Sequence, residues 1–312
     1  MSTERLHLWS WERSFHEWAG PHFKRVFVAL HPFTQVPGLK LNADGYLDLK
    51  RVPQTHPAAA MARSGVTGPD GIASNHDSVM KKFGKARTWG WAVQAAGLRD
   101  AAHLARAIDS VLNRAKDEFL DKQAAHKLAR LLAAHDMMLP VEDYLSPMIE
   151  PAIGRLYRQL GIETVEIGNQ MDDAAAHVGV EDFLNPGQAL IEMDVPARAA
   201  YSHDDTMQLL TISDWNAHYT LVCLSAEAAS KLDPSRELEG FWAGEATSAD
   251  WPYAEILARR KAQTPNPNPK PKPRQPEGRA GGSGDRKPHA GRAQPRHKPG
   301  PGTGGKPRNR KP

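Results

Sequence analysis

The chain holds a single cysteine, Cys223, in 312 residues. One cysteine excludes an intramolecular disulfide and any metal site built from several thiolates. Cys223 lies within an apolar run, and the neighbouring sequence offers no base and no helix start that would lower its pKa. We therefore expect a buried structural thiol and not a nucleophile.

Long apolar runs are missing as well, because no stretch approaches the ~20 residues that a helix needs to cross a bilayer. The first fifteen residues carry charges at Glu4 and Arg5 and have no apolar centre, so they do not match a signal peptide. These absences predict a cytoplasmic protein without membrane association.

Residues 264–312 contain no aromatic side chain and no aliphatic side chain larger than alanine, yet they hold 12 of the 25 prolines. Without apolar area to bury, this segment cannot offset the ~1–2 kcal/mol per residue that backbone ordering costs. The composition predicts a disordered tail, with polyproline II structure at residues 265–273. Residues 1–263 then form a single folded domain.

The net charge of the chain changes sign at the same boundary. The tail has 13 Lys or Arg against two acidic residues, a net charge of +11, which leaves 27 basic and 34 acidic residues, a net charge of −7, in residues 1–263. A flexible polycation binds nucleic acid by releasing counterions, without reading its sequence, and this tail has no aromatic ring to stack on bases. The alternative is a solvating extension that folds back over its own acidic domain, because the two net charges attract each other. The predicted polyanion-binding residues are Lys270, Lys272, Arg274, Arg279, Arg286, Lys287, Arg292, Arg296, Lys298, Lys306, Arg308, Arg310 and Lys311.

The folded part is organised around a predicted β-hairpin at about residues 206–224. Two β-rich runs, 206–213 and 218–224, flank Asp214-Trp215-Asn216-Ala217, and Asp and Asn favour tight turns. The second run is apolar on both faces, which is typical of a central strand. The run Ala189–Val195 is expected to supply a third strand.

Shorter signals surround this hairpin. Val26–Leu30 predicts a strand that ends at His31-Pro32, and Asp44-Gly45 predicts a second hairpin between Leu39–Leu41 and Tyr46–Val52. Apolar stripes predict helices at 6–19, from a cap at Asp100 through Phe119, at 128–135, from Ser146-Pro147 to 160, from a cap at Ser225 to 232, and at 250–261. Strands, then helices, then strands predict an α+β fold with a mostly antiparallel sheet covered by helices.

The hairpin region also carries a set of metal-ligating and acid–base residue types: His203, Asp204, Asp205, Asp214 and His218. If the first strand runs straight, His203 lies ten residues from the turn, roughly 33 Å at ~3.3 Å per residue. The two histidines then cannot share an ion unless the strand breaks near Asp205 and folds back, so we expect structural roles, no metal and no cofactor.

Residues 93–108, with the sequence VQAAGLRDAAHLARAI, resemble the second half of an AraC-type helix-turn-helix, with Gly97 in the turn. The resemblance implies that Arg99, Asp100, His103 and Arg106 face the major groove of DNA. Residues 80–91 lack the usual pattern of the first helix, and no second unit of this kind is present.

Three other segments, His31–Gly38, His203–Ser225 and Glu237–Ala243, resemble a bacterial family of uncharacterised proteins, a domain of unknown function. The similarity covers roughly residues 23–253 and implies one folded domain with the hairpin inside it. Because the family has no assigned activity, the resemblance assigns no functional residue.

Three functional hypotheses follow. In the first, the protein is not an enzyme, and its acidic domain binds a protein partner, as acidic surfaces bind basic proteins. In the second it binds nucleic acid, through the tail alone or with residues 93–108. In the third it is an enzyme with a pocket beside His31 or His218, although the chain has no nucleophile elbow, His-Glu-x-x-His or dinucleotide fingerprint, and its catalytic residues are unknown.

Overall fold

The structure is a computed structural model, and it describes residues 13–20, 22–65, 74–169, 175–193 and 200–263. The predictions for the tail, including its thirteen cationic residues, lie outside the described residues.

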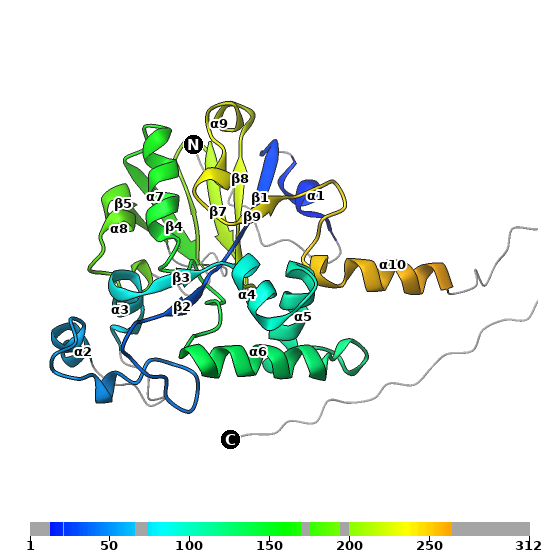
Figure 1. The fold of residues 1–312 in the computed structure, drawn as a ribbon. Coiled ribbons are helices and arrows are strands. Elements are labelled where there is room, and N and C mark those ends of the chain that lie inside the picture. The colour runs from blue at the N-terminus through cyan, green and yellow to red at the C-terminus, as the bar shows by residue number, and fades with distance from the viewer. Residues whose placement is uncertain (1–12, 21, 66–73, 170–174, 194–199, 264–312) are drawn as a thin grey trace, which may run out of the picture. The chain divides into compact units, whose positions relative to one another are not determined.

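An antiparallel sheet forms the centre of the folded domain (Figure 1). Within the described residues it has seven strands in the order β5-β4-β6-β7-β8-β1-β9. A second sheet pairs β2 with β3. The strands are β1 (Arg25–Leu30), β2 (Phe33–Gln35), β3 (Lys85–Arg87), β4 (Thr164–Asn169), β5 (Ala175–Gly179), β6 (Ala200–His203), β7 (Leu209–Ser213), β8 (Tyr219–Leu224) and β9 (Gly240–Trp242).

Helices cover both faces of the large sheet, so the predicted α+β fold is confirmed. They are α1 (Phe15–Ala19), α2 (Ala59–Ser64), α3 (His76–Phe83), α4 (Trp89–Ala96), α5 (Ala101–Val111), α6 (Lys122–His135), α7 (Glu150–Gln159), α8 (Val180–Leu184), α9 (Ala226–Lys231) and α10 (Ala254–Gln263), with 3-10 turns η1 (Leu49–Arg51), η2 (Asp117–Phe119), η3 (Leu190–Glu192), η4 (Pro234–Arg236) and η5 (Trp251–Tyr253). None of the described helices is long and apolar enough to traverse a bilayer.

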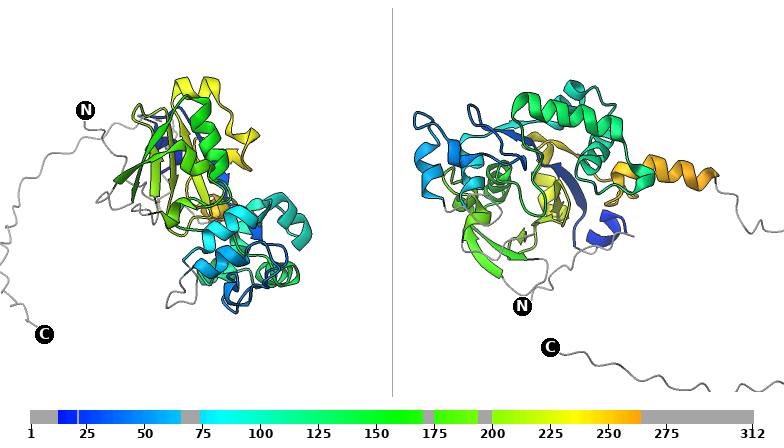
Figure 2. Two further views of the ribbon diagram at one scale, coloured as in Figure 1. Left: turned by 90° about the vertical axis from the view of Figure 1, so that its left-hand side faces the viewer. Right: turned by 90° about the horizontal axis from the view of Figure 1, so that it is seen from below.

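Alternation along β1 divides the core into two layers, because successive side chains of a strand point to opposite faces. Val26 and Val28 pack with α1, α4, α5 and α6, whereas Phe27 and Ala29 pack with α7, α8 and α9. Figure 2 shows α4, α5 and α6 gathered beside one end of the sheet. A third, smaller core joins α2 and α3 to the segment 36–49.

The predicted central hairpin is confirmed. β7 and β8 pair from Leu209↔Leu224 to Ser213↔Thr220, and all their residues are buried. The Asp214–Ala217 turn closes with a hydrogen bond from the Ala217 amide to the Asp214 carbonyl of 3.1 Å, and Asn216 adopts a φ of 59°. Burial raises the pKa of the Cys223 thiol, which is fully enclosed in β8, as expected for a structural thiol.

Of the two geometries that the sequence allows for residues 203–213, the structure has the break near Asp205 and not the straight strand, because the chain folds back at Asp204-Asp205. β6 ends at His203, which pairs with Leu210 of β7. The Asp204 carboxylate stabilises the reversal by accepting from the Thr206 and Leu209 amides, both at 2.8 Å. The estimate of roughly 33 Å, at ~3.3 Å per residue, therefore rests on a strand that does not exist.

Other local predictions differ from the structure in extent. The segment 189–195 forms the 3-10 turn η3 and not a strand, and residues 194–199 lie outside the description. Around Asp44-Gly45 the predicted hairpin shrinks to one bridge, Leu41↔Leu47, followed by η1. The predicted caps Asp100 and Ser225 are confirmed, since their side chains accept from the amides of His103 and Ala228 respectively. α5 ends at Val111, well before Phe119, and α7 begins at Glu150, later than expected.

Candidate functional site

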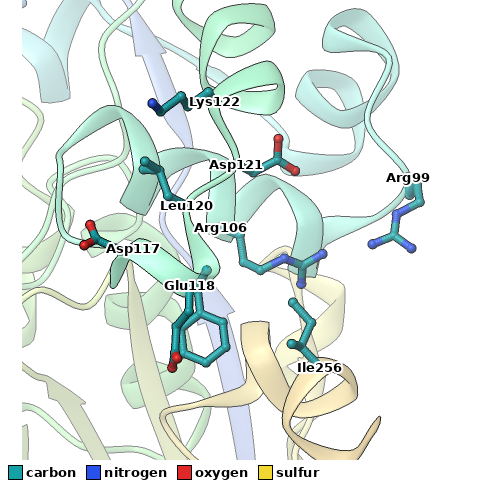
Figure 3. A pocket seen from close by; sticks show the side chains of 9 residues that line it. Arg99, Arg106, Asp117, Glu118, Leu120, Asp121, Lys122 and Ile256 are labelled. Atoms are coloured by element: carbon teal, nitrogen blue, oxygen red, sulfur yellow. The ribbon is translucent and has the colours of Figure 1, made fainter. Parts of the chain in front are cut away.

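A pocket of about 670 Å³ lies among α5, η2, the start of α6 and α10 (Figure 3). Its walls carry charges of both signs and three apolar side chains. The lining residues are Arg99, Arg106, Asp117, Glu118, Phe119, Leu120, Asp121, Lys122 and Ile256.

The back wall of the pocket is set by the start of α6. Asp121 caps this helix by accepting from the Ala124 amide at 2.9 Å, and the same carboxylate contacts Nε2 of His103 at 3.0 Å. Partial burial opposes ionisation of Asp121, but the Ala124 amide, His103 and Arg106 together lower its pKa. The carboxylate therefore stays charged and fixes α5 against α6.

The opposite wall is α10, which is held by the preceding turn η5 and by Arg260 in its second half. The Tyr253 hydroxyl donates to Asp109 at 2.5 Å, and the rings of Tyr253 and Phe119 lie 4.9 Å apart. The Arg260 guanidinium lies 4.7 Å from the centre of the Phe119 ring and pairs with Glu118 at 3.1 Å. These contacts connect α10 to η2, so the pocket joins segments that are far apart in the sequence.

Arg106 is the unusual member of the pocket lining, because only 5% of the residue is exposed. Its Nη1 donates to the Pro252 carbonyl, and within the described residues it forms no ion pair. Arg106 occupies a position between Leu104 and Ile108, on a part of α5 that is buried throughout. An arginine among the apolar positions of a helix is the sequence signal for this pocket. The helix-turn-helix interpretation instead assigned Arg106 to the major groove of DNA.

Next to the pocket, α6 exposes a basic face. The fourteen residues of this helix include no acidic side chain, and Lys122, Lys127 and Arg130 are all exposed. Lys127 donates to the Gly97 carbonyl at 3.2 Å, which connects this face to the turn before α5. The helical end of the domain is thus locally basic, although residues 1–263 carry a net charge of −7.

The predicted helix-turn-helix geometry exists in part, since α4 and α5 meet at Gly97, whose φ is 62°. The prediction that Arg106 faces the major groove is wrong, because this side chain is buried against Pro252. His103 is held by Asp121, and Asp100 is the cap of α5. Of the four residues assigned to DNA, Arg99 alone is an exposed cation.

His31 and His218 lie together at one end of the sheet, where the His31 amide donates to the His218 carbonyl at 2.9 Å. The His31 ring is fully buried, with Nδ1 2.7 Å from the Val141 carbonyl and Nε2 2.7 Å from the Thr220 hydroxyl. Burial lowers the pKa of His31 to about 3, and burial also lowers the pKa of His218. Both rings are neutral parts of the core.

No group of three or more His, Cys, Asp or Glu side chains that could hold a metal ion occurs in the described part of the chain. Asp172-Asp173, another acidic pair, lies outside that part.

A second buried polar cluster connects α3 to α7. Nζ of Lys81 lies 2.6 Å from Oε2 of Glu150, and the two side chains are 1% and 0% exposed. Asp77 accepts from the Tyr144 hydroxyl at 2.8 Å, and Glu192 binds the Ser78 amide at 2.9 Å. Burial raises the pKa of Asp77 to about 6 and that of Glu150 to about 7. Sequence reasoning missed this cluster because Lys81 and Glu150 come from distant segments.

Comparison with known proteins gives one match. The family model described as "Protein of unknown function (DUF2711)" matches residues 16–253. Neither the curated proteins nor the solved structures include a match.

Proposed function

The chain belongs to this family of unknown function, and we propose that it is a non-enzymatic protein whose folded domain binds a protein partner. The proposed docking surface is the helical end made of α5, α6 and α10. The observation that supports it is the exposed basic face of α6, Lys122, Lys127 and Arg130, on a domain of net charge −7.

Local charge decides which kind of partner fits this surface. The net charge of the domain alone favours a basic partner, but complementarity acts through the charges at the contact. An acidic protein segment fits beside α6, where a 14-residue helix presents cations without a neighbouring carboxylate of its own. We therefore propose an acidic segment as the partner.

α10 adds an apolar contact to the same surface. Residues 257–262 of this helix are exposed, and Leu257 is 39% exposed. An apolar side chain amid a charged rim is the usual anatomy of an interface. Leu257 provides the apolar contact, and the α6 cations provide the charged rim.

A fluorescent decaglutamate peptide tests this function by anisotropy titration of the chain that ends at Gln263, because the thirteen cations of residues 264–312 would themselves bind the peptide. Neutralising the α6 cations in K122Q/K127Q/R130Q is expected to weaken binding by about 10-fold, because three complementary charges are lost from the contact. The matched control, K24Q/K50Q/R63Q, removes three other exposed cations and lowers the net charge equally. If both triple variants weaken binding to the same extent, binding follows net charge and α6 is not the docking surface.

Nucleic-acid binding through the tail is the second candidate, and the thirteen cations of residues 264–312 favour it. Full-length protein is expected to bind duplex DNA and RNA without sequence preference, and its affinity should fall steeply with salt. A chain that ends at Gln263 should lose this binding. Equal binding by the shorter chain, with a preferred sequence, would instead place recognition in the folded domain.

The third hypothesis, an enzyme with its pocket beside His31 or His218, gains no support from these two rings, because both are enclosed in the core.

A further inference from the structure

We propose that the pocket among α5, η2 and α10 is a binding site for the carboxylate or phosphate group of a small organic anion, held by Arg106 and Arg99. The pocket adjoins the α6 face and shares Lys122 with it, but the proposed anion site depends on Arg99 and Arg106, which are not among the three cations of that face.

Arg106 carries most of the argument. Burying a guanidinium is costly unless it is paired and hydrogen-bonded. The group has five N–H donors, and the described residues supply one acceptor, the Pro252 carbonyl, and no carboxylate in ion-pair contact. Asp121 lines the same pocket and interacts with Arg106 through its charge, but no carboxylate of the described residues forms an ion pair with this guanidinium, so most of its N–H donors remain available to an anionic ligand.

Arg99 supplies a second guanidinium. It lies in the turn between α4 and α5, is exposed, and its side chain forms no hydrogen bond or ion pair with the described residues. In Figure 3 the guanidinium groups of Arg99 and Arg106 point toward one another, and that of Arg106 lies beside Ile256 in this view. Planar guanidinium forks bind carboxylates and phosphates through two parallel hydrogen bonds each.

The remaining walls indicate the body of the ligand. The volume of about 670 Å³ falls within the range of ~300–1,000 Å³ that is usual for small-molecule sites. Phe119, Leu120 and Ile256 offer apolar surface, and in the view of Figure 3 Asp117 and Glu118 lie away from Arg99. Asp121 lines the pocket as well, and the three carboxylates together repel a second anionic group, so a ligand with one anionic end and an apolar body fits best.

Isothermal titration of the full-length protein with phenyl phosphate, benzoate and inorganic phosphate tests the site. The aromatic anions are expected to bind more tightly than inorganic phosphate, and the better of the two identifies the preferred anionic group. R99Q and R106K are each expected to weaken that binding by about 10-fold or more, because each removes a charge-assisted fork. R63Q, which removes an exposed arginine of α2, should bind as the parent does.

R106K keeps the charge and a donor for the Pro252 carbonyl, so it preserves the hydrogen bond that connects α5 to the turn before α10. Should R106K still unfold, R99Q tests the site by itself, because Arg99 is exposed and its side chain forms no hydrogen bond or ion pair within the described fold. The inference is overturned if no probe binds at concentrations up to about 10 mM, a range that detects even weak sites. It is equally overturned if R99Q and a folded R106K bind as tightly as the parent.

Discussion

Replacing Lys81 with methionine is expected to lower the free energy of unfolding by about 3–5 kcal/mol, the usual cost of removing one partner from a buried ion pair. Lys81 and Glu150 are almost fully enclosed, with 2.6 Å between Nζ and Oε2. Lys81 also donates to the Gln188 carbonyl at 2.9 Å, so the variant leaves a carboxylate and a carbonyl without their donor. Urea denaturation at pH 8 measures the change.

An exposed ion pair provides the matched control. Lys231 and Glu227 lie 2.7 Å apart on α9, but their side chains are 52% and 66% exposed. K231M is therefore expected to change stability by no more than about 0.5 kcal/mol, because water screens such a pair. A cost for K81M as small as that for K231M would mean that water reaches the buried pair.

A double variant and a measurement at a second pH distinguish the cost of an unpaired buried charge from the cost of a packing defect. K81M/E150Q should recover much of the stability lost in K81M, since no unpaired charge is then buried. Burial raises the pKa of Glu150 to about 7, so at pH 5 the carboxyl can take up a proton when Lys81 is missing. The cost of K81M should consequently be smaller at pH 5 than at pH 8, whereas a packing defect would cost the same at both.

The sequence predicts those parts of the fold that depend on neighbouring residues. The β7–β8 hairpin follows from the Asp214–Ala217 turn and two apolar runs, and α6 follows from the spacing of Leu128, Leu131 and Leu132. Caps are equally local, as the bonds of Asp100 and Ser225 to amides three residues later show. In each case the residues that determine the element are close together in the sequence.

Long-range contacts explain what the sequence does not predict. The Lys81–Glu150 pair joins residues of α3 and α7 that no local pattern relates. Arg106 fits the pattern of an exposed recognition helix as well as that of a pocket wall, and only its packing against Pro252 distinguishes them. The sequence leaves the reversal at Asp204 undecided: its carboxylate bonds nearby amides, but the β-rich residues on either side match a single straight strand equally well.

Acidification from pH 7 toward pH 4 is expected to destabilise the domain through its buried histidines. Burial lowers the pKa of His31 from 6.5 to about 3 and that of His76 to about 4, and burial also lowers the pKa of His218. A group whose pKa is lower in the folded state binds its proton preferentially in the unfolded chain. Its contribution to stability is complete above pH 6.5 and is lost as the pH falls toward the folded-state pKa.

The buried carboxyls act with the opposite sign. The pKa values of Asp77 and Glu150, raised by burial to about 6 and about 7, make these groups favour folding at low pH and oppose it as the pH rises through those values. Each unit of pKa difference corresponds to about 1.4 kcal/mol, so the shift of His31 alone exceeds either carboxyl shift. Between pH 7 and pH 4 the carboxyls therefore offset much of the histidine contribution, so the decline on the acid side is shallower than the histidines alone would give.

His31→Gln isolates the largest of these contributions. At pH 7.5 the variant should be less stable by about 1–3 kcal/mol, because glutamine cannot satisfy both the Val141 carbonyl and the Thr220 hydroxyl in the same geometry. At pH 4.5 the difference should shrink or reverse, since the parent then loses stability to protonation of the unfolded chain and the variant does not. His126→Gln, which replaces an exposed histidine of α6, should leave the pH profile unchanged. Parallel pH profiles for H31Q and the parent, measured by urea denaturation, would show that His31 is not held neutral in the core.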